Sequence, residues 1–190
     1  MQKFKSIKIL FIFLIGSVTL AKMPLYGSLF IIVLVYLLNF KSINDEFKNF
    51  KVSNLKFLLL AIPMILLNYL SLFLISKVTS LPQNETLLRS LVTVSPLHYS
   101  FVFGVLSPIS EELTFRYGFN GIKNKYVYMI FTSILYASFH LSGFSEILYI
   151  IPYFILGLFF AYIYKKTDSI VYPMILHIIN NLVSLLLIIF

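Results

Sequence analysis

The sequence contains no cysteine among its 190 residues. Disulfide bonds, thiolate nucleophiles and cysteine-ligated zinc or iron–sulfur sites are therefore excluded. Charged residues are also scarce, at 12%, whereas 59% of the residues are hydrophobic. A soluble globular domain has about 45–50% apolar residues. The composition therefore indicates a polytopic membrane protein, in which any hydrolytic chemistry must use Glu, His, Ser, Asn or Tyr side chains.

The chain also lacks a Pro/Gly/Ser-rich linker, a low-complexity tract and a clear internal repeat. We therefore expect a single transmembrane domain over residues 1–190. Its lysines are not grouped into a basic face with interleaved aromatic residues, which is the pattern of a nucleic-acid-binding domain. They lie between apolar runs instead. With this placement, the formal net charge of +8 predicts the lipid bilayer as the partner, and not nucleic acid.

Seven apolar runs predict an all-α bundle of about seven transmembrane helices. Two polar stretches interrupt them: residues 41–56 are expected to form a loop or an interfacial helix, and residues 77–96 a second polar loop. The first run also has a faint signal-peptide pattern at Thr19-Leu20-Ala21, but the apolar run that follows at once favours an uncleaved span. The predicted spans are 9–21, 23–40, 57–76, 97–119, 126–141, 146–164 and 169–190.

The cations in the loops predict the orientation of these spans. If the N-terminus is cytoplasmic, the outer side carries three cations, Lys22, Lys77 and Arg89, and the inner side carries eleven. Because cytoplasmic loops are enriched in Lys and Arg, we expect a cytoplasmic N-terminus and an external C-terminus. The inner cations are Lys3, Lys5, Lys8, Lys41, Lys48, Lys51, Lys56, Lys123, Lys125, Lys165 and Lys166.

One segment of the fourth span, from Ser107 to Arg116, carries three ionisable side chains at membrane depth. Charges there are costly, and by default they mark a functional site. Glu112 and Arg116 are four residues apart, so on a helix they share one face and can form an ion pair. Glu111 points about 100° away around the helix, free to face another group. Pro108 either begins a renewed helix capped by Ser107 or kinks a continuous one.

Two later spans bring further polar groups: His140 ends the fifth, and His177 and Asn181 lie four residues apart in the seventh. Together with Glu111 they predict a polar catalytic cavity inside the membrane. A glutamate and a histidine from different helices can hold and activate a water molecule. A His/Asn pair on one helical face can donate hydrogen bonds to the oxyanion of a tetrahedral intermediate.

Depth along the spans raises one difficulty for this site. At 1.5 Å per residue, Glu112 lies about 10 Å and His177 about 12 Å from the inner ends of their spans, but His140 lies about 21 Å from the inner end of its span. For the groups to converge, the fifth span must begin later, or tilt and bending must close the gap.

Each polar group also has a structural explanation when it is taken alone. Glu112 with Arg116 can be a structural ion pair. A histidine in a span, like Asn180 or Asn181, can simply hydrogen-bond two helices together. The combination favours function, because three separate helices each contribute polar groups at helical spacing.

At these residues the sequence resembles the CAAX protease and bacteriocin-processing (CPBP) family of intramembrane proteases. The resemblance covers residues 97–186, which we take as the catalytic core, and one departure is Tyr117, where the family usually has Gly. The matching motifs are Glu-Glu-x-x-x-Arg at Glu111, Glu112 and Arg116, an aromatic residue followed by His at Tyr136 and His140 (with Tyr for the commoner Phe), His-x-x-x-Asn at His177 and Asn181, and the Ser169…Pro173 spacing before it.

The resemblance implies a peptide hydrolase in which Glu111 and His140 activate water, Glu112 and Arg116 support the site, and His177 with Asn181 forms the oxyanion hole. A divalent metal such as zinc is an alternative, with Glu111, His140 and His177 as its ligands. We favour a metal-independent site without a cofactor, because Arg116 would compete with a cation for Glu112.

The substrate and the role stay open between several alternatives. In a bacterium the resemblance implies an endopeptidase of the plasma membrane that processes a bacteriocin, a pheromone or another small peptide. In a eukaryote it implies a CAAX prenyl endopeptidase. A non-catalytic immunity or scaffold protein of the same fold needs the cavity but not the base. A transporter is less favoured because the chain lacks detectable inverted repeats. The short chain favours the bacterial interpretation.

Overall fold

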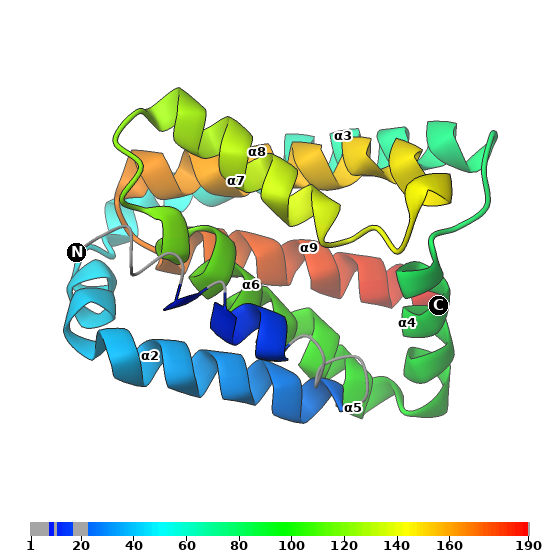
Figure 1. Ribbon diagram of the computed structural model, residues 1–190. Coiled ribbons are helices and arrows are strands. Elements are labelled where there is room, and N and C mark those ends of the chain that lie inside the picture. Colours follow the sequence, from blue (N-terminus) through cyan, green and yellow to red (C-terminus); the bar gives the residue numbers. More distant parts are fainter. Residues whose placement is uncertain (1–7, 10, 17–22, 190) are drawn as a thin grey trace.

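The computed structural model describes residues 8–9, 11–16 and 23–189, and this part of the chain is helical without strands (Figure 1). Within residues 23–189, eight α-helices are joined by short 3₁₀ segments and one π-helical turn. The α-helices are α2 (Pro24–Lys48), α3 (Ala61–Ser76), α4 (Gln83–Val94), α5 (Pro96–Phe101), α6 (Ser107–Phe115), α7 (Lys125–Ser138), α8 (Ile150–Thr167) and α9 (Val171–Ile189). The other segments are the 3₁₀ helices η1 (Val52–Leu60), η3 (Tyr117–Phe119) and η4 (Phe144–Tyr149) and the π turn η2 (Val102–Leu106).

The prediction of an all-α transmembrane bundle is confirmed. Four helical segments of the described residues are long and apolar enough to cross a bilayer: 24–48, 52–76, 144–167 and 171–189. Large apolar side chains point outward from them, since Leu37, Leu66 and Leu187 are each 64 or 65% exposed. Such exposure along whole helices fits lipid and not water as the surrounding solvent. The protein is therefore an integral membrane protein, and the count of seven spans stays a prediction.

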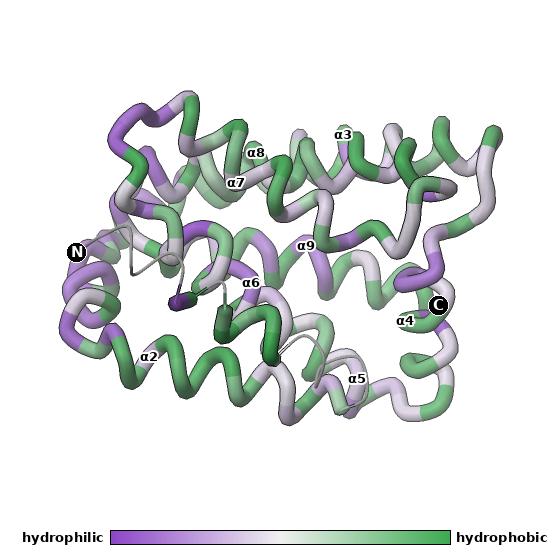
Figure 2. Tube along the Cα trace, viewed as in Figure 1, coloured by the Kyte–Doolittle hydropathy of each residue, from purple (hydrophilic) through white to green (hydrophobic). Residues whose placement is uncertain are grey.

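Helix α9 lies at the centre of the bundle. In Figure 1 it runs between α2 and α6 on one side and the layer of α3, α7 and α8 on the other. Figure 2 shows α2 as mainly apolar, whereas α6 and the middle of α9 carry polar bands inside the molecule. Helices α7 and α8 approach closely at Gly157, where an added Cβ would lie 2.9 Å from the Cα of Ser133. Small residues at such a crossing let two membrane helices pack backbone against backbone.

The fourth predicted span is a nearly continuous helical run, with a π turn directly ahead of Pro108. Proline has no N–H, so a carbonyl in the preceding turn loses its partner. The helix widens by one residue there, and the N–H of Ser107 donates to the carbonyl of Val102. The helical backbone is continuous through Ser107, whose side chain does not cap a new helix, and the accommodation of Pro108 takes the form of a π turn.

Two of the predicted boundaries differ at the polar stretches. Helix α2 continues beyond Phe40 to Lys48, bending at Asn39, whose backbone is not helical. Its polar end is stabilised by an ion pair between Lys48 and Asp45. Residues 77–96 are not simply a loop, because they contain α4. That helix is amphipathic and is supported by an ion pair of 2.9 Å between Arg89 and Glu85, four residues apart.

The fifth predicted span is shorter than expected. Helix α7 begins at Lys125, capped by the Asn124 side chain, and ends at Ser138. Its 14 residues would reach about 21 Å at 1.5 Å per residue, less than the roughly 30 Å of the hydrocarbon core. His140 therefore follows the helix in a turn and not within it.

The N-terminal predictions fall largely outside the described residues. Within the first predicted span, the described residues 9 and 11–16 are helical. The faint cleavage pattern at Thr19-Leu20-Ala21 lies outside the described part of the chain.

Candidate active site

The predicted ion pair between Glu112 and Arg116 is present and completely buried. Arg116 Nε lies 3.4 Å from Glu112 Oε2, and both side chains have 0% exposure. The guanidinium also donates to the carbonyl of Gly157 at 3.3 Å. Its central carbon lies 4.7 Å from the ring centre of Tyr136 and 5.4 Å from that of Phe160. Aromatic faces stabilise a desolvated cation, so Arg116 is held by groups from three helices.

The same carboxylate orients His177 on α9. Nδ1 of His177 lies 2.9 Å from Glu112 Oε1, and the imidazole is stacked on Phe160 with 4.4 Å between ring centres. A carboxylate can only accept, so the proton sits on Nδ1 and the free position is Nε2. Glu112 thus fixes both the ring and the tautomer of His177, in the same way that a carboxylate orients a catalytic histidine elsewhere.

Glu111 faces a different set of groups, as its position around the helix predicts. Its Oε1 accepts a hydrogen bond of 2.9 Å from Ser107, one turn earlier. Its Oε2 is buried and has no hydrogen-bond partner within the described residues. That oxygen lies 3.7 Å from His140 Nε2 and 3.8 Å from His177 Nε2. Both distances exceed a direct hydrogen bond, and they suit a small molecule shared by the three groups.

His140 reaches this point from the turn after α7. Its Nδ1 lies 2.9 Å from the carbonyl of Tyr136. A carbonyl can only accept, so the proton sits on Nδ1 and Nε2 presents a lone pair toward Glu111. The ring packs on Tyr153 with 4.4 Å between centres, and Asn84 of α4 donates to the His140 carbonyl at 2.9 Å. Bending of the chain beyond α7, and not a later start of the span, brings His140 to the depth of Glu111.

Tyr136 contacts Arg116, His140 and His177, although the sequence motif indicates only its spacing to His140. Its ring lies under Arg116, and its centre is 4.4 Å from that of the His140 ring. Its buried hydroxyl lies 3.4 Å from His177 Nε2. The aromatic position in the motif did not predict a role for this hydroxyl. Ser107 was not predicted as a partner of Glu111 either, although the spacing of four residues on one helix could have indicated it.

Asn181 lies one turn beyond His177, and its amide is engaged with the backbone of the π turn. Its Nδ2 donates to the carbonyl of Phe103 at 3.0 Å, and its Oδ1 accepts from Asn180 at 3.2 Å. The residue five positions after Phe103 is Pro108, which has no N–H to offer this carbonyl. Asn181 therefore supplies a missing partner, and one amide hydrogen remains for another acceptor.

No group of three or more His, Asp or Glu side chains in the described ranges is arranged to hold a metal ion. Zinc ligands lie about 2.0–2.2 Å from the metal. The alternative ligand set of Glu111, His140 and His177 stays a prediction.

When all of its Glu and Arg side chains are ionised, the buried site carries one more negative charge than positive charges. Glu111 and Glu112 bring two carboxylates, and Arg116 brings one guanidinium. One further proton on a histidine or a carboxyl makes the cluster neutral, and uncompensated charge at this depth is costly. A carboxylate beside two imidazoles is an arrangement that can exchange a proton with a bound molecule, which is what general acid–base catalysis requires.

Part of the chain is similar to known proteins. Residues 93–183 match the family model described as type II CAAX prenyl endopeptidase Rce1-like, and that range contains all six predicted site residues. A similar protein is UPF0177 protein YxdF of Lactococcus lactis subsp. lactis (strain IL1403), 34% identical over 119 residues. The alignment covers 60% of this chain and 66% of that protein, just under two thirds of its length. No solved structure gives a significant match. The segment that holds the site, residues 93–183, is thus similar to the Rce1-like type II CAAX prenyl endopeptidases.

Proposed function

We propose that this protein is an intramembrane endopeptidase that hydrolyses a peptide bond with a water molecule activated by Glu111 and His140. The observation that carries the proposal is the buried Oε2 of Glu111. It has no hydrogen-bond partner in the described residues, and two imidazole nitrogens face it at 3.7 and 3.8 Å. Leaving such an atom unpaired costs about 1–3 kcal/mol. A water molecule between these three groups would remove that cost.

The reaction begins when Glu111 takes a proton from this water and the hydroxide attacks the carbonyl carbon of the peptide. His140 orients the water through the lone pair of Nε2, which the bond from Nδ1 to the Tyr136 carbonyl leaves available. The carbonyl π bond opens and its electrons move to oxygen. The proton held by Glu111 then passes to the amide nitrogen, the C–N bond breaks, and an acid and an amine leave.

The oxyanion of the intermediate is stabilised in this proposal by His177 and Asn181. Asn181 has one amide hydrogen beyond the one that it gives to Phe103. His177 donates through Nε2 when it carries a second proton, and Glu112 balances the resulting charge. Arg116 holds Glu112 in place through their ion pair of 3.4 Å. No metal ion or cofactor is needed for these steps.

The proposed substrate is a bacteriocin, a pheromone or another small peptide, and the proposed location is a bacterial plasma membrane with the N-terminus in the cytoplasm. The Lactococcus relative supports a bacterial host, and the distribution of loop cations supports the orientation. Reporter fusions at Lys56 and Phe190 should report opposite sides of the membrane. The same side for both would rule out seven spans with this orientation.

The activity is tested with the purified protein in liposomes, incubated with a peptide library under chelator and analysed by mass spectrometry. We expect defined cleavage products that are absent with Glu111→Gln. Binding of peptides without cleavage by the wild-type protein would contradict the proposal and would favour an immunity or scaffold role.

A further inference from the structure

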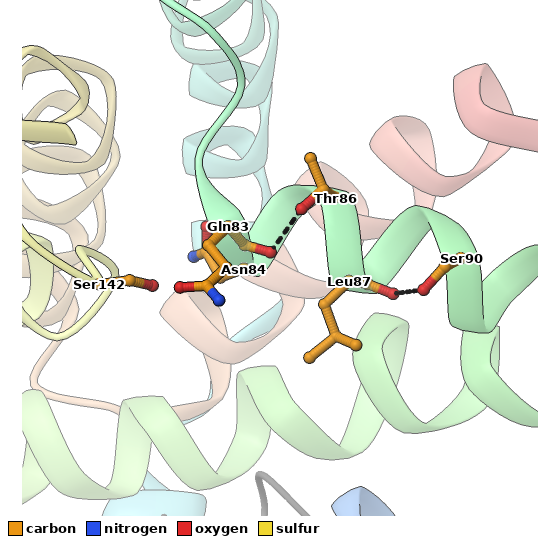
Figure 3. Close-up of a pocket in the computed structure, with 6 residues that line it drawn as sticks. All are labelled: Gln83, Asn84, Thr86, Leu87, Ser90 and Ser142. Atoms are coloured by element: carbon orange, nitrogen blue, oxygen red, sulfur yellow. Dashed lines mark hydrogen bonds between the residues drawn. The ribbon is translucent and has the colours of Figure 1, made fainter. Parts of the chain in front are cut away.

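A pocket of about 450 Å³ lies between α4 and the turn that follows His140. Figure 3 shows five of its lining residues on α4, with Ser142 facing them from the turn. The pocket is at the end of the bundle where α3 leads into α4 and where η4 leads into α8 (Figure 1). Its lining consists of Gln83, Asn84, Thr86, Leu87, Ser90 and Ser142.

This pocket adjoins the proposed active site through two side chains. Asn84 lines the pocket, donates to the His140 carbonyl at 2.9 Å and lies 3.5 Å from the hydroxyl of Tyr153. Tyr153 in turn packs against the His140 ring. The Asn84 side chain therefore connects the pocket directly to the turn that carries His140.

The lining offers hydrogen-bond acceptors and carries no charged side chain. Thr86 and Ser90 donate their hydroxyl hydrogens to the carbonyls of Gln83 and Leu87 at 2.8 and 2.7 Å, as Figure 3 shows. Their oxygen lone pairs remain for an N–H from a ligand. Gln83 and Asn84 add neutral amides, which can both donate and accept.

Binding of an anion in this pocket is disfavoured, because the carboxylates of Glu146 and Glu85 lie next to its lining residues. Glu146 accepts from the N–H of Gln83 and from that of Ser142, each at 2.7 Å. It thereby satisfies the positive end of α4 that could otherwise attract a negative group. Glu85 is held by Arg89 at 2.9 Å, so that cation is also engaged.

We propose that this pocket is a substrate subsite that binds an uncharged, polar stretch of the peptide next to the bond that is cleaved. The inference rests on the proposed function, because it takes a peptide as the substrate. The apolar part of such a peptide lies in the bilayer beside the bundle. Its Ser/Asn-rich flank emerges at this end of the helices and hydrogen-bonds to the neutral lining of the pocket.

The test measures peptide binding, so that it does not depend on cleavage. The probes are fluorescently labelled synthetic peptides with one common apolar half. They carry no flank, a Ser/Asn flank, a flank with Glu residues or a flank with Lys residues. Each is titrated into the Glu111→Gln protein in detergent by fluorescence anisotropy. We expect the Ser/Asn flank to tighten binding about tenfold over the unflanked peptide, the gain from one or two hydrogen bonds.

The pocket is then filled by Ser90→Phe in the same background. This change should bring the ratio of the two dissociation constants close to one. The matched control is Thr93→Phe, an exposed residue of the same helix outside the lining, which should leave the ratio unchanged. An unchanged ratio in Ser90→Phe, an equal loss in Thr93→Phe, or tighter binding of the Glu or Lys flank would overturn the subsite.

The two proposals can fail separately. If the wild-type protein cleaves none of the peptides but the ratio responds as expected, the proposed hydrolysis is wrong and the pocket is a peptide-binding site without a cleaved substrate. If it cleaves the peptides with equal efficiency whatever their flank, the hydrolysis stands and the subsite is wrong.

Discussion

The hydroxyl of Tyr136 lies 3.4 Å from Nε2 of His177, the nitrogen that also faces Glu111. This contact joins α7 to α9 within the site. Because Nδ1 of His177 is bound to Glu112, a hydroxyl donor at Nε2 completes the hydrogen bonding of the ring while the histidine is neutral. Tyr136 therefore helps to hold His177 in place between turnovers.

We expect Tyr136→Phe to lower kcat by about tenfold, the cost of one hydrogen bond near the reacting groups. The ring and its packing under Arg116 are kept by this change, so the fold should persist. The control is Tyr172→Phe, which removes a hydroxyl bonded to the backbone of Lys51. It should lower the stability without changing kcat. Equal kcat values for Tyr136→Phe and the wild type would show that the hydroxyl does not support catalysis.

Ser107 should act through Glu111. Its hydroxyl holds Oε1 of that carboxylate at 2.9 Å, which directs Oε2 toward the histidines. We expect Ser107→Ala to lower kcat about tenfold with KM nearly unchanged, and Ser107→Thr to restore it. Ser110→Ala is the matched control, because this buried hydroxyl donates to the Ser107 carbonyl and not to the Glu111 carboxylate. A comparable loss of kcat in Ser110→Ala would indicate a general disturbance of α6.

Asn181→Ala should reduce kcat by about 10²–10³ with KM nearly unchanged, if its amide stabilises the oxyanion. The thermal midpoint should also fall, because the Phe103 carbonyl loses its donor. Asn180→Ala should affect kcat much less. The Asn180 side chain bonds to Oδ1 of Asn181 and not to Nδ2, the group that donates. Greater loss of kcat in Asn180→Ala, or an effect of Asn181→Ala wholly on KM, would contradict the oxyanion role.

Gly157 is expected to tolerate no side chain. A Cβ there would lie 2.9 Å from the backbone of Ser133, and the Gly157 carbonyl accepts from Arg116. We expect Gly157→Ala to destabilise the protein by about 1–3 kcal/mol, seen as a lower midpoint of thermal unfolding in detergent. Gly143→Ala is the control, because its nearest neighbour would be 4.0 Å away. Equal midpoints for the two variants would show that α7 and α8 can move apart without a loss of stability.

The parts of the site that lie on one helix could be predicted from the sequence. The pair of Glu112 and Arg116, and the divergence of Glu111 from it, follow from the period of the helix alone. The position of His140 could not be obtained in this way. It depends on the end of α7 at Ser138. It also depends on the hydrogen bond from Asn84 of α4 to the His140 carbonyl and on the packing of Tyr153 against the His140 ring.

Two other features needed the tertiary structure. Helix α4 is too polar to be recognised as a span, and its docking on the His140 turn depends on Glu146, which is more than 60 positions away in the sequence. The engagement of Asn181 depends on a π turn that forms on another helix ahead of Pro108. Periodicity describes which residues share a face, but not which carbonyl of a neighbouring helix lacks a partner.

The central claim is that Glu111 activates the attacking water, and single-turnover hydrolysis of a cleaved peptide by Glu111→Gln tests it most directly. The amide keeps the size of the side chain and can still accept from Ser107, but it cannot take a proton. We predict that peptide binding persists while the rate of cleavage falls by about 10²–10⁴, the contribution of a general base. Cleavage by Glu111→Gln at a rate close to that of the wild-type protein would contradict the account.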